Sequence, residues 1–222
     1  MLYRVNNLYT CVQGEGTLAG TAMVLLRLHG CGVGCIWCDT GETWFVRNED
    51  KVNNLEQALG TNTRFVEMSA QAIAQIIVEQ HKGPKWVLVT GGEPTEQPLK
   101  PLVTELQRSG YRVALETSGT ANGGVGASIN WVCVSPKIDN PNGKPLLPEV
   151  IFEADELKFI VGKEADLEKV DRFLATFRYK ESTQILLQPL SLNPKATKLC
   201  IETVQNRGWR LSIQTHKYLD LP

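Results

Sequence analysis

Three cysteines lie within eight residues of one another, in the spacing C-x3-C-x2-C: Cys31, Cys35 and Cys38. Three thiolates on a glycine-bearing loop can bind one face of an iron–sulfur cube, a cluster that normally takes four cysteines. The remaining cysteines share no spacing pattern with these three and lie far away in the sequence: Cys11, Cys133 and Cys200. A cluster with three protein ligands leaves one iron open, and an open iron can bind and reduce a small molecule.

Two other interpretations of the cysteines remain open. A disulfide would use two of them, but residues 1–6 lack the apolar segment of a signal peptide, so we expect a reducing, cytoplasmic location that disfavours disulfides. A structural zinc site wants four ligands, usually in two separated pairs, and Asp39 or His29 could complete one here. We expect the iron–sulfur cluster.

The composition is ordinary for one globular domain covering residues 1–222. Hydrophobic residues make up 42% of the chain, charged residues make up 21%, and the net charge is −1. No basic excess points to a nucleic-acid partner. No apolar stretch reaches the ~18–20 residues that a membrane span needs. We therefore expect a single domain without nucleic-acid or membrane partners.

Apolar, β-branched runs alternate with helical patterns along the chain. We predict strands at 22–28, 86–90, 111–116, 131–134, 156–161, 184–188 and 209–214, and helices at 69–80, 99–109, 167–177 and 195–207. Repeated strand–helix units form a parallel sheet with right-handed crossovers. These strands are too few for a closed eight-stranded barrel, so we expect an open, partial TIM-like α/β barrel of about six mostly parallel strands. The polar stretch 41–67 is predicted to be a loop or an insertion.

Five polar or glycine-containing motifs directly follow predicted strands. They are the cysteine loop, Gly91-Gly92-Glu93-Pro94, Thr117-Ser118-Gly119, Ser135-Pro136-Lys137 and Gln188-Pro189. Each alone is typical of a turn. Sites in open α/β folds form at the carboxyl ends of the strands, however, and these five motifs share that edge. The two adjacent glycines let the backbone approach a ligand closely, while Glu93 can either support the loop or pair with a charge on the ligand.

Residues in and before the first predicted strand suit the binding of a polar ring. Gln13 and Glu15 offer donor and acceptor groups that match the edge of a guanine-like or pterin ring. Arg27 lies inside an apolar strand and therefore needs a partner. That partner is either Glu15 or Glu116 within the protein, or a substrate carboxylate bound bidentately.

Two further motifs are ambiguous on the residues alone. Asp39 and Thr40 follow the last cysteine and offer the hard oxygen ligands that Mg²⁺ prefers, but by themselves they are more typical of a turn. His216 follows the last predicted strand, and a lone histidine is more often structural than a ligand. Its place at the strand ends makes it a candidate for binding the substrate.

Together these motifs resemble the radical SAM (S-adenosylmethionine) family, in which SAM chelates the open iron, and within it the 7-carboxy-7-deazaguanine synthases. The resemblance runs from Tyr9 to Lys217. Besides the cysteine motif, it rests on Gln13-Gly14-Glu15-Gly16, Arg27-Leu28-His29-Gly30, Trp37-Cys38-Asp39-Thr40, Thr90-Gly91-Gly92-Glu93-Pro94, Glu116-Thr117-Ser118-Gly119-Thr120, Ser135-Pro136-Lys137, Gln188-Pro189 and Gln214-Thr215-His216-Lys217. The stretch 41–67 matches no motif of the family.

The resemblance implies a carbon–nitrogen lyase that converts 6-carboxy-5,6,7,8-tetrahydropterin to 7-carboxy-7-deazaguanine with loss of ammonia, in queuosine and 7-deazapurine biosynthesis, with SAM used catalytically. It implies a 4Fe–4S cluster on the three cysteines and Mg²⁺ on Thr40. The residues implied for SAM are Trp37, Asp39, Gly92, Glu93, Ser118, Ser135, Pro136, Lys137 and Gln188. Those implied for the substrate are Val12, Gln13, Gly14, Glu15, Arg27, Thr90, His216 and Pro222. A flavodoxin-like electron donor and a homodimer are implied as well.

Two alternatives belong to other functional classes. A glycyl-radical-enzyme activase of the same superfamily would consume SAM stoichiometrically and act on a protein partner, and the motif at 13–16 argues against it. A non-catalytic binding module stabilised by a metal would hold zinc, or an iron cluster that never cleaves SAM. The polar groups gathered at the strand ends argue against that module.

Overall fold

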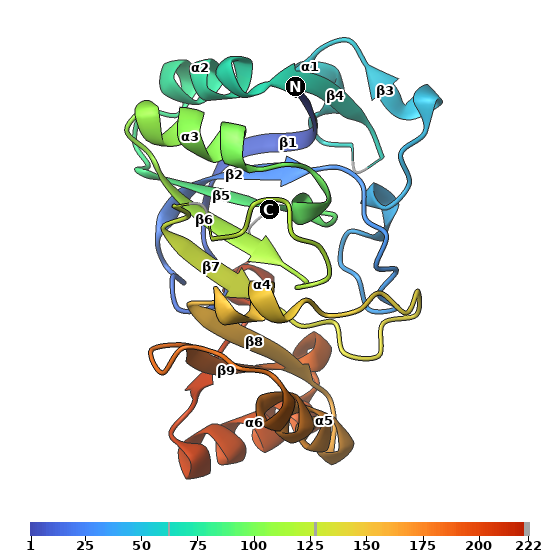
Figure 1. Cartoon of the computed structure of the whole chain (residues 1–222), viewed down its shortest axis with the longest axis vertical. Helices are drawn as coiled ribbons and strands as arrows, with labels where there is room; N and C mark the ends of the chain where they lie inside the picture. Colours follow the sequence, from blue (N-terminus) through green and yellow to red (C-terminus); the bar gives the residue numbers. More distant parts are fainter. Residues whose placement is uncertain (62, 127, 220–222) are drawn as a thin grey trace.

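A curved sheet of ten strands is the frame of the molecule in the computed structural model (Figure 1). The structure describes residues 1–61, 63–126 and 128–219. Within them the strand order is β10-β9-β8-β7-β6-β5-β2-β1-β4-β3, so β10 and β3 are the two edges of the sheet. The barrel is therefore open, as the sequence predicts.

Seven neighbouring strands run parallel and correspond to the seven predicted apolar runs. They are β2 (Ala22–Leu28), β5 (Trp86–Gly91), β6 (Arg112–Thr117), β7 (Trp131–Val134), β8 (Glu156–Val161), β9 (Gln184–Pro189) and β10 (Arg210–Leu211). The prediction 209–214 was too long for β10. The strand ends at Leu211, although the amide of Ser212 still donates to the carbonyl oxygen of Leu187 at 2.9 Å. Beyond it, the side chain of Gln214 donates to Glu15.

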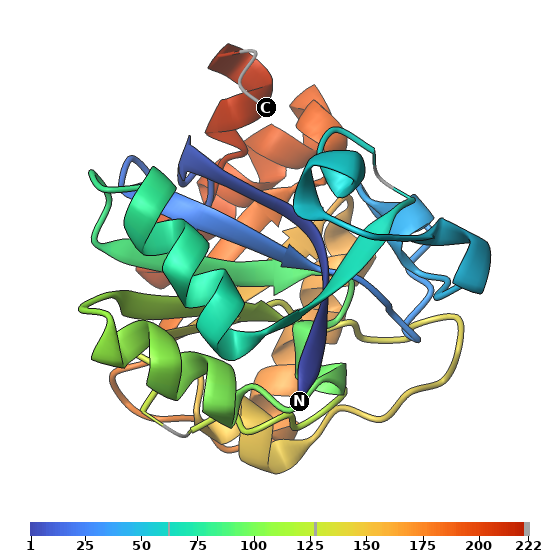
Figure 2. The same cartoon turned by 90° about the horizontal axis from the view of Figure 1, so that it is seen from above.

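The four predicted helices cover the outer face of this sheet (Figures 1 and 2). They are α2 (Ala70–Gln80), α3 (Lys100–Arg108), α5 (Glu164–Thr176) and α6 (Pro194–Arg207). Ser69 caps α2, because its hydroxyl accepts a hydrogen bond from the amide of Ala72 at 3.1 Å. α6 ends at Gly208, which adopts the left-handed conformation with φ 68°.

The shorter helical segments join these elements. They are η1 (Gly41–Thr43), η2 (Asn48–Asp50), α1 (Leu55–Ala58), η3 (Pro94–Glu96), α4 (Pro148–Phe152), η4 (Leu190–Leu192) and α7 (Thr215–Leu219). In the described residues no helix is both long enough and apolar enough to cross a membrane.

Three strands on the other side of β2 were not predicted. β1 (Leu2–Val12) pairs antiparallel with β2 and with β4 (Phe65–Ser69), and β3 (Lys51–Val52) pairs parallel with β4. The apolar alternation of β1 is broken where the register shifts between Val5 and Asn7. The buried Asn6 at that bulge donates to the carbonyl oxygens of Thr61 and Arg64.

The prediction that 41–67 is a loop or an insertion was therefore incomplete. This stretch contains η1, η2, β3, α1 and the first residues of β4, and β3 and β4 extend the sheet beyond β1. α1 is capped by Asn54, whose side chain accepts the amide of Gln57 at 3.1 Å. Short polar elements of this kind carry too few apolar residues to show a period in the sequence.

Alternation along the parallel strands positions the site. A small apolar cluster fills the inner side of the sheet, formed by Met23, Leu25, Leu88 and Ala114. Side chains two residues further along a strand point to the same face, so Arg27, Thr90 and Glu116 continue the inner face toward the carboxyl ends of β2, β5 and β6. The inner face is thus apolar at one end and polar at the other.

Candidate active site

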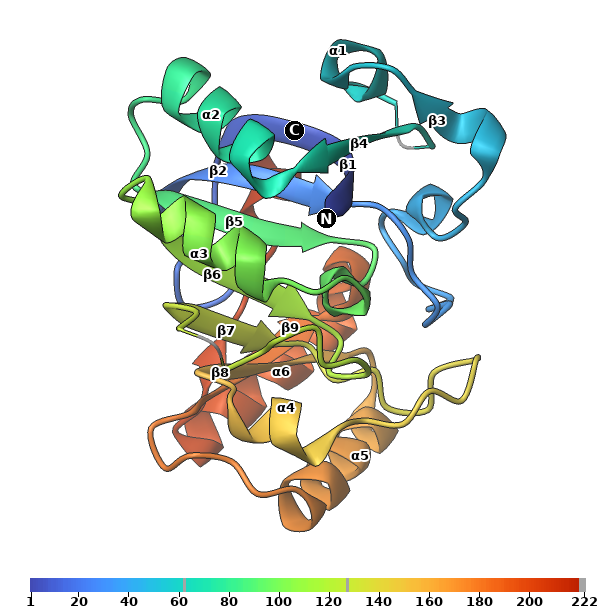
Figure 3. The ribbon, with the colours of Figure 1, turned by 45° about the horizontal axis from the view of Figure 1, so that its top comes forward.

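The loops that follow the parallel strands lie on one side of the sheet (Figure 3). They line a cavity of about 330 Å³. All but two of the residues predicted for the site line it: Val12, Gln13, Gly14, Glu15, Arg27, Cys31, Cys35, Trp37, Cys38, Asp39, Thr40, Thr90, Gly92, Glu93, Ser118, Ser135, Lys137, Gln188 and His216. Of the other two, Pro136 lines a separate, smaller cavity, and Pro222 lies outside the described residues.

The cysteine loop follows β2 and offers three thiols to this cavity. Hydrogen bonds fix the loop, including one from the amide of Cys31 to the carbonyl oxygen of Trp44 at 3.0 Å. N–H groups also point at sulfur atoms: the amide of Val33 donates to Cys31 Sγ at 3.5 Å, and Trp44 Nε1 donates to Cys38 Sγ at 3.3 Å. Such donors stabilise the sulfur ligands of iron–sulfur clusters and tune their potential. The residues of this loop therefore fit the cluster that the cysteine spacing predicts.

Burial keeps two thiols of this loop, those of Cys31 and Cys35, protonated. It raises the pKa of Cys31 to about 11 and also raises the pKa of Cys35. Iron binding must therefore release these protons, because the thiolate is the ligand. Cys11 and Cys133 also line the cavity, but they come from β1 and β7 rather than from the cysteine loop.

The two glycines after β5 pack directly against the cysteine loop. The amide of Glu93 donates to the carbonyl oxygen of Gly30 at 2.9 Å. A Cβ on Gly91, which has φ 131°, would collide with the backbone of Leu28, and a Cβ on Gly92 would collide with the carbonyl oxygen of Gly30. Glycine is therefore required here, and it brings this backbone against the loop that carries the thiols.

The carboxylate of Glu93 supports the loops around it. Its Oε1 accepts the amide of Thr95 at 3.1 Å and the hydroxyls of Thr95 and Thr117 at 2.6 and 2.8 Å. Its Oε2 accepts both the amide and the hydroxyl of Ser118. The side chain is 1% exposed and these five donors occupy both oxygens. This favours loop support over direct pairing with a ligand charge, the two roles that the sequence left open.

The segment after β7 joins the main cavity to a second one of about 60 Å³. Lys137 and Trp37 line both cavities, whereas Pro136 lines only the smaller one. Lys137 Nζ donates to Ser135 Oγ at 2.7 Å. Burial lowers the pKa of Lys137, although nearby acidic groups such as Cys35 act in the opposite direction.

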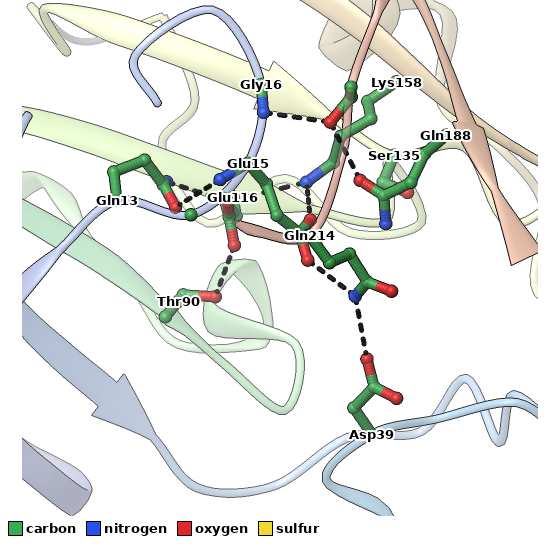
Figure 4. Close-up of polar contacts among 12 residues, drawn as sticks. Gln13, Glu15, Gly16, Asp39, Thr90, Glu116, Ser135, Lys158, Gln188 and Gln214 are labelled. Atoms are coloured by element: carbon green, nitrogen blue, oxygen red, sulfur yellow. Dashed lines mark hydrogen bonds and ion pairs between the residues drawn. The ribbon is translucent and has the colours of Figure 1, made fainter. Parts of the chain in front are cut away.

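A network of acidic and amide groups forms the far wall of the main cavity (Figure 4). Glu116 accepts hydrogen bonds from Gln13 Nε2 at 3.2 Å and from Thr90 Oγ1 at 3.0 Å. Glu15 accepts a hydrogen bond from Gln214 Nε2 at 2.8 Å and another from Lys158 Nζ. Burial alone raises the pKa of Glu15, but the charge of Lys158 outweighs it and holds that pKa at about 2.

Lys158 is the main residue that the sequence predictions missed. It is 4% exposed, on β8, and its ammonium group pairs with Glu15 and lies 3.7 Å from Glu116. Burial by itself lowers the pKa of Lys158, but the two carboxylates raise it well above its usual value. The available signal was a lysine inside the otherwise apolar run of 156–161, since a buried lysine needs an acidic partner.

Arg27 has no such partner. It lines the cavity from β2, and its side chain makes no hydrogen bond or ion pair with any residue that the structure describes. The pairing with Glu15 or Glu116, one of the two alternatives for Arg27, is not formed, because Lys158 pairs with both carboxylates. Of the two partners that the sequence left open, a substrate carboxylate remains.

The segment after β10 closes the cavity next to the cysteine loop. Gln214 Nε2 donates to Asp39 Oδ2 at 3.3 Å as well as to Glu15, and Lys217 Nζ lies 3.4 Å from Asp39 Oδ1. The hydroxyl of Thr40 has one long contact, 3.8 Å from Cys38 Sγ, which leaves its oxygen available to a hard cation. The hydroxyl of Thr40 therefore fits a Mg²⁺ ion that keeps most of its waters, whereas Asp39 is paired with Gln214 and Lys217.

The fold and the site define the class of the protein. An open parallel barrel carries a three-cysteine loop at its strand ends, and residues 25–178 match the model of the Radical SAM superfamily. The chain is 39% identical, over 225 aligned residues and the full length of both chains, to 7-carboxy-7-deazaguanine synthase of Escherichia coli (strain K12). It is 36% identical, again over both full lengths, to the enzyme of the same name from Buchnera aphidicola subsp. Schizaphis graminum. The crystal structure of QueE from Escherichia coli superposes with a TM-score of 0.89 at 36% identity, covering 96% of this chain and 94% of that one. The chain belongs to the 7-carboxy-7-deazaguanine synthase family of radical SAM enzymes.

Proposed function

We propose that the protein converts 6-carboxy-5,6,7,8-tetrahydropterin to 7-carboxy-7-deazaguanine and ammonia, a step of queuosine-type deazapurine biosynthesis. The observation that carries this proposal is that Arg27, whose side chain has no partner in the described residues, lines the same cavity as Glu15, Glu116 and the three thiols. A carboxylated pterin has complementary groups. Its carboxylate suits the guanidinium group, and its ring N–H groups suit the two carboxylates.

The chain's own residues bind and orient the substrate in this proposal. Arg27 binds the substrate carboxylate bidentately, while Glu15 and Glu116 accept hydrogen bonds from the N–H groups of the ring. Thr90 and Gln13 orient Glu116 through their hydrogen bonds to it. When bound, the 4Fe–4S cluster and SAM supply the one-electron chemistry that removes a hydrogen atom from the substrate.

SAM is assigned to the side of the cavity nearest the cysteine loop. The glycine pair after β5 holds its backbone against that loop, and Glu93 fixes the amide and hydroxyl of Ser118 beside it. The same side is lined by Trp37, Ser135, Lys137 and Gln188. These residues present backbone and side-chain polar groups to the SAM amino, carboxylate and ribose groups, and the smaller cavity lined by Pro136 extends this region.

Mg²⁺ is assigned to Thr40, next to the last cysteine of the loop. A single protein oxygen, waters and the substrate carboxylate are enough for this ion, which commonly keeps several waters. Thr40→Val removes the hydroxyl at nearly constant volume. We expect this variant to need more Mg²⁺ for half-maximal activity than the wild type while it keeps its iron content.

We also assign the protein to the cytoplasm, as a homodimer that receives electrons from a flavodoxin-like donor. Light scattering during gel filtration tests the dimer, and cluster reduction by a purified flavodoxin tests the donor. The chemistry of the cavity needs an electron, but it does not depend on this particular donor or on the dimer.

Discrimination between two pterins tests the proposed function. The reconstituted enzyme with SAM is titrated anaerobically with 6-carboxytetrahydropterin and with the same pterin lacking the carboxylate. Because each charge-assisted hydrogen bond contributes about 1.5–3 kcal/mol, we expect the carboxylated pterin to bind on the order of 100-fold tighter. Equal affinities would contradict the role of Arg27 and the proposed substrate.

A further inference from the structure

Lys158 brings together two segments that lie far apart in the sequence. Glu15 comes from the turn after β1, Glu116 comes from the end of β6, and the ammonium group on β8 lies between their carboxylates (Figure 4). The lysine side chain is 5% exposed, whereas those of Glu15 and Glu116 are 17% and 26% exposed. All three side chains line the cavity, and the lysine is the least exposed of them.

One cation thus lies between two carboxylates that line the cavity. The other titratable or charged groups around this trio, from the strands and the terminal segment packed against it, are Cys11, Arg27, Cys133, Lys137, Glu156 and His216. Among these, Arg27 lines the cavity without a protein partner.

We infer that Lys158 is a positioning residue that keeps both Glu15 and Glu116 as hydrogen-bond acceptors, so that the site selects a ring with adjacent N–H donors along one edge. This inference rests on the proposed function and deepens it, because it assigns the choice of substrate class to the pair of carboxylates. Lys158 acts through these carboxylates rather than on the substrate.

The electrostatics of the pair explain why the lysine is needed. Two carboxylates that share a buried site repel each other, and burial disfavours the charge on each. Without a cation between them, one carboxyl takes up a proton near neutral pH and becomes a donor. A protonated carboxyl group keeps only its carbonyl oxygen as a good acceptor and has lost its charge, so its hydrogen bonds to ring N–H groups are weaker.

The pH dependence of binding separates this role from simple packing. Without Lys158, the pair regains its second acceptor only as the pH rises through the raised pKa. Substrate binding then improves with pH, whereas wild-type binding stays flat because Glu15, with a pKa of about 2, is ionised throughout. A lysine that only filled space would give a loss of affinity that does not change with pH.

The experiment measures substrate affinity of the SAM-loaded holoenzyme from about pH 6 to about pH 9, a range that brackets neutral pH. Lys158→Met removes the charge at similar length, Lys158→Gln keeps a neutral donor, and Lys158→Arg restores the charge. Lys51→Met is the matched control, because Lys51 forms an exposed ion pair with Glu67 at 2.6 Å outside the cavity.

We expect Lys158→Met and Lys158→Gln to raise the Kd for the pterin at least about tenfold at the acid end, with recovery at the alkaline end. Lys158→Arg and Lys51→Met should stay within about threefold of the wild type, and SAM affinity and iron content should be unchanged in all four. A Kd for Lys158→Gln that equals the wild type, or a loss that is constant with pH, would overturn the inference. If Lys158→Met does not fold, the glutamine variant decides.

A second readout needs no substrate. Infrared difference spectra of the holoenzyme report the carbonyl stretch of a protonated carboxyl group. We expect this band near neutral pH in Lys158→Gln, its absence in the wild type, and its loss when Glu15→Gln and Lys158→Gln are combined. If the wild type does not bind the pterin, the proposed function fails and these spectra alone decide the inference: no band in Lys158→Gln overturns it.

Discussion

Replacing Glu93 tests whether its carboxylate supports the site from behind. In Glu93→Ala, five donors lose their acceptor at once. The hydroxyls can turn to each other, since Thr95 and Thr117 lie 3.3 Å apart and Ser118 and Thr120 lie 2.8 Å apart. The backbone amides of Thr95 and Ser118 have no such choice, so two buried N–H groups are left without an acceptor.

The two orphaned amides set the size of the effect. Each buried donor without a partner costs about 1–3 kcal/mol, so Glu93→Ala should lower the free energy of unfolding by about 2–6 kcal/mol. Glu93→Gln keeps one carbonyl oxygen and should lose roughly half of that amount. With a urea m-value of roughly 3 kcal/mol/M, the midpoint for Glu93→Ala should fall by roughly 1–2 M.

Urea unfolding of the iron-free chain, followed by circular dichroism, measures this shift. Glu67→Ala is the control, because Glu67 forms an exposed ion pair with Lys51 and its loss should cost no more than about 1 kcal/mol. A Glu93→Ala midpoint equal to that of Glu67→Ala would refute the assignment of Glu93 to loop support.

Three further predictions concern the cavity. Arg27→Ala should raise the KM for the pterin on the order of 100-fold while the iron content stays at the wild-type value. A variant that lost its iron and kept its KM would contradict the role of Arg27. Gly92→Ala should lower both iron content and SAM affinity, because a Cβ there collides with the carbonyl oxygen of Gly30. Gly83→Ala is the control and should leave both unchanged, because a Cβ at Gly83 meets no atom within 4 Å. Equal effects of the two substitutions would contradict this prediction. Glu15 has a folded pKa of about 2 against an ordinary value of 4.5, so it contributes about 3 kcal/mol that is present above pH 4.5 and lost as the pH falls through the folded pKa. Urea unfolding of the iron-free chain between about pH 5 and about pH 2 should therefore show a shallower pH slope in Glu15→Gln, and an unchanged slope would count against the buried ion pair.

The parallel strands from β2 to β9 could be predicted because each is a short, mostly apolar run that is largely buried. β1 could not be predicted, since its apolar alternation is interrupted at the bulge that contains Asn6. The buried side chain of Asn6 donates hydrogen bonds to two carbonyl groups of the segment before β4. A buried asparagine looks like a surface residue in a sequence, because its partners lie more than fifty residues away. The apolar pattern of 209–214 also did not show where β10 ends, since the polar contact that Gln214 makes with Glu15 is not visible in the sequence.

The part of the site that follows strand ends could also be predicted, because parallel strands bring their carboxyl ends to one edge. Which charges pair within it could not. Arg27 and Lys158 are both cations inside apolar strands, and each is a plausible partner for Glu15 by sequence alone. Only the packing of β8 beside β7 shows that Lys158 takes the carboxylates and leaves Arg27 facing the cavity.

Anaerobic turnover tests the central claim most directly. The protein is reconstituted with iron and sulfide and mixed with dithionite, SAM, Mg²⁺ and 6-carboxytetrahydropterin, and the products are followed by mass spectrometry. The account predicts 7-carboxy-7-deazaguanine and ammonia in equal amounts, with many product molecules formed for each SAM lost. Cleavage of SAM without 7-carboxy-7-deazaguanine would contradict it and would favour an activase that acts on a protein partner.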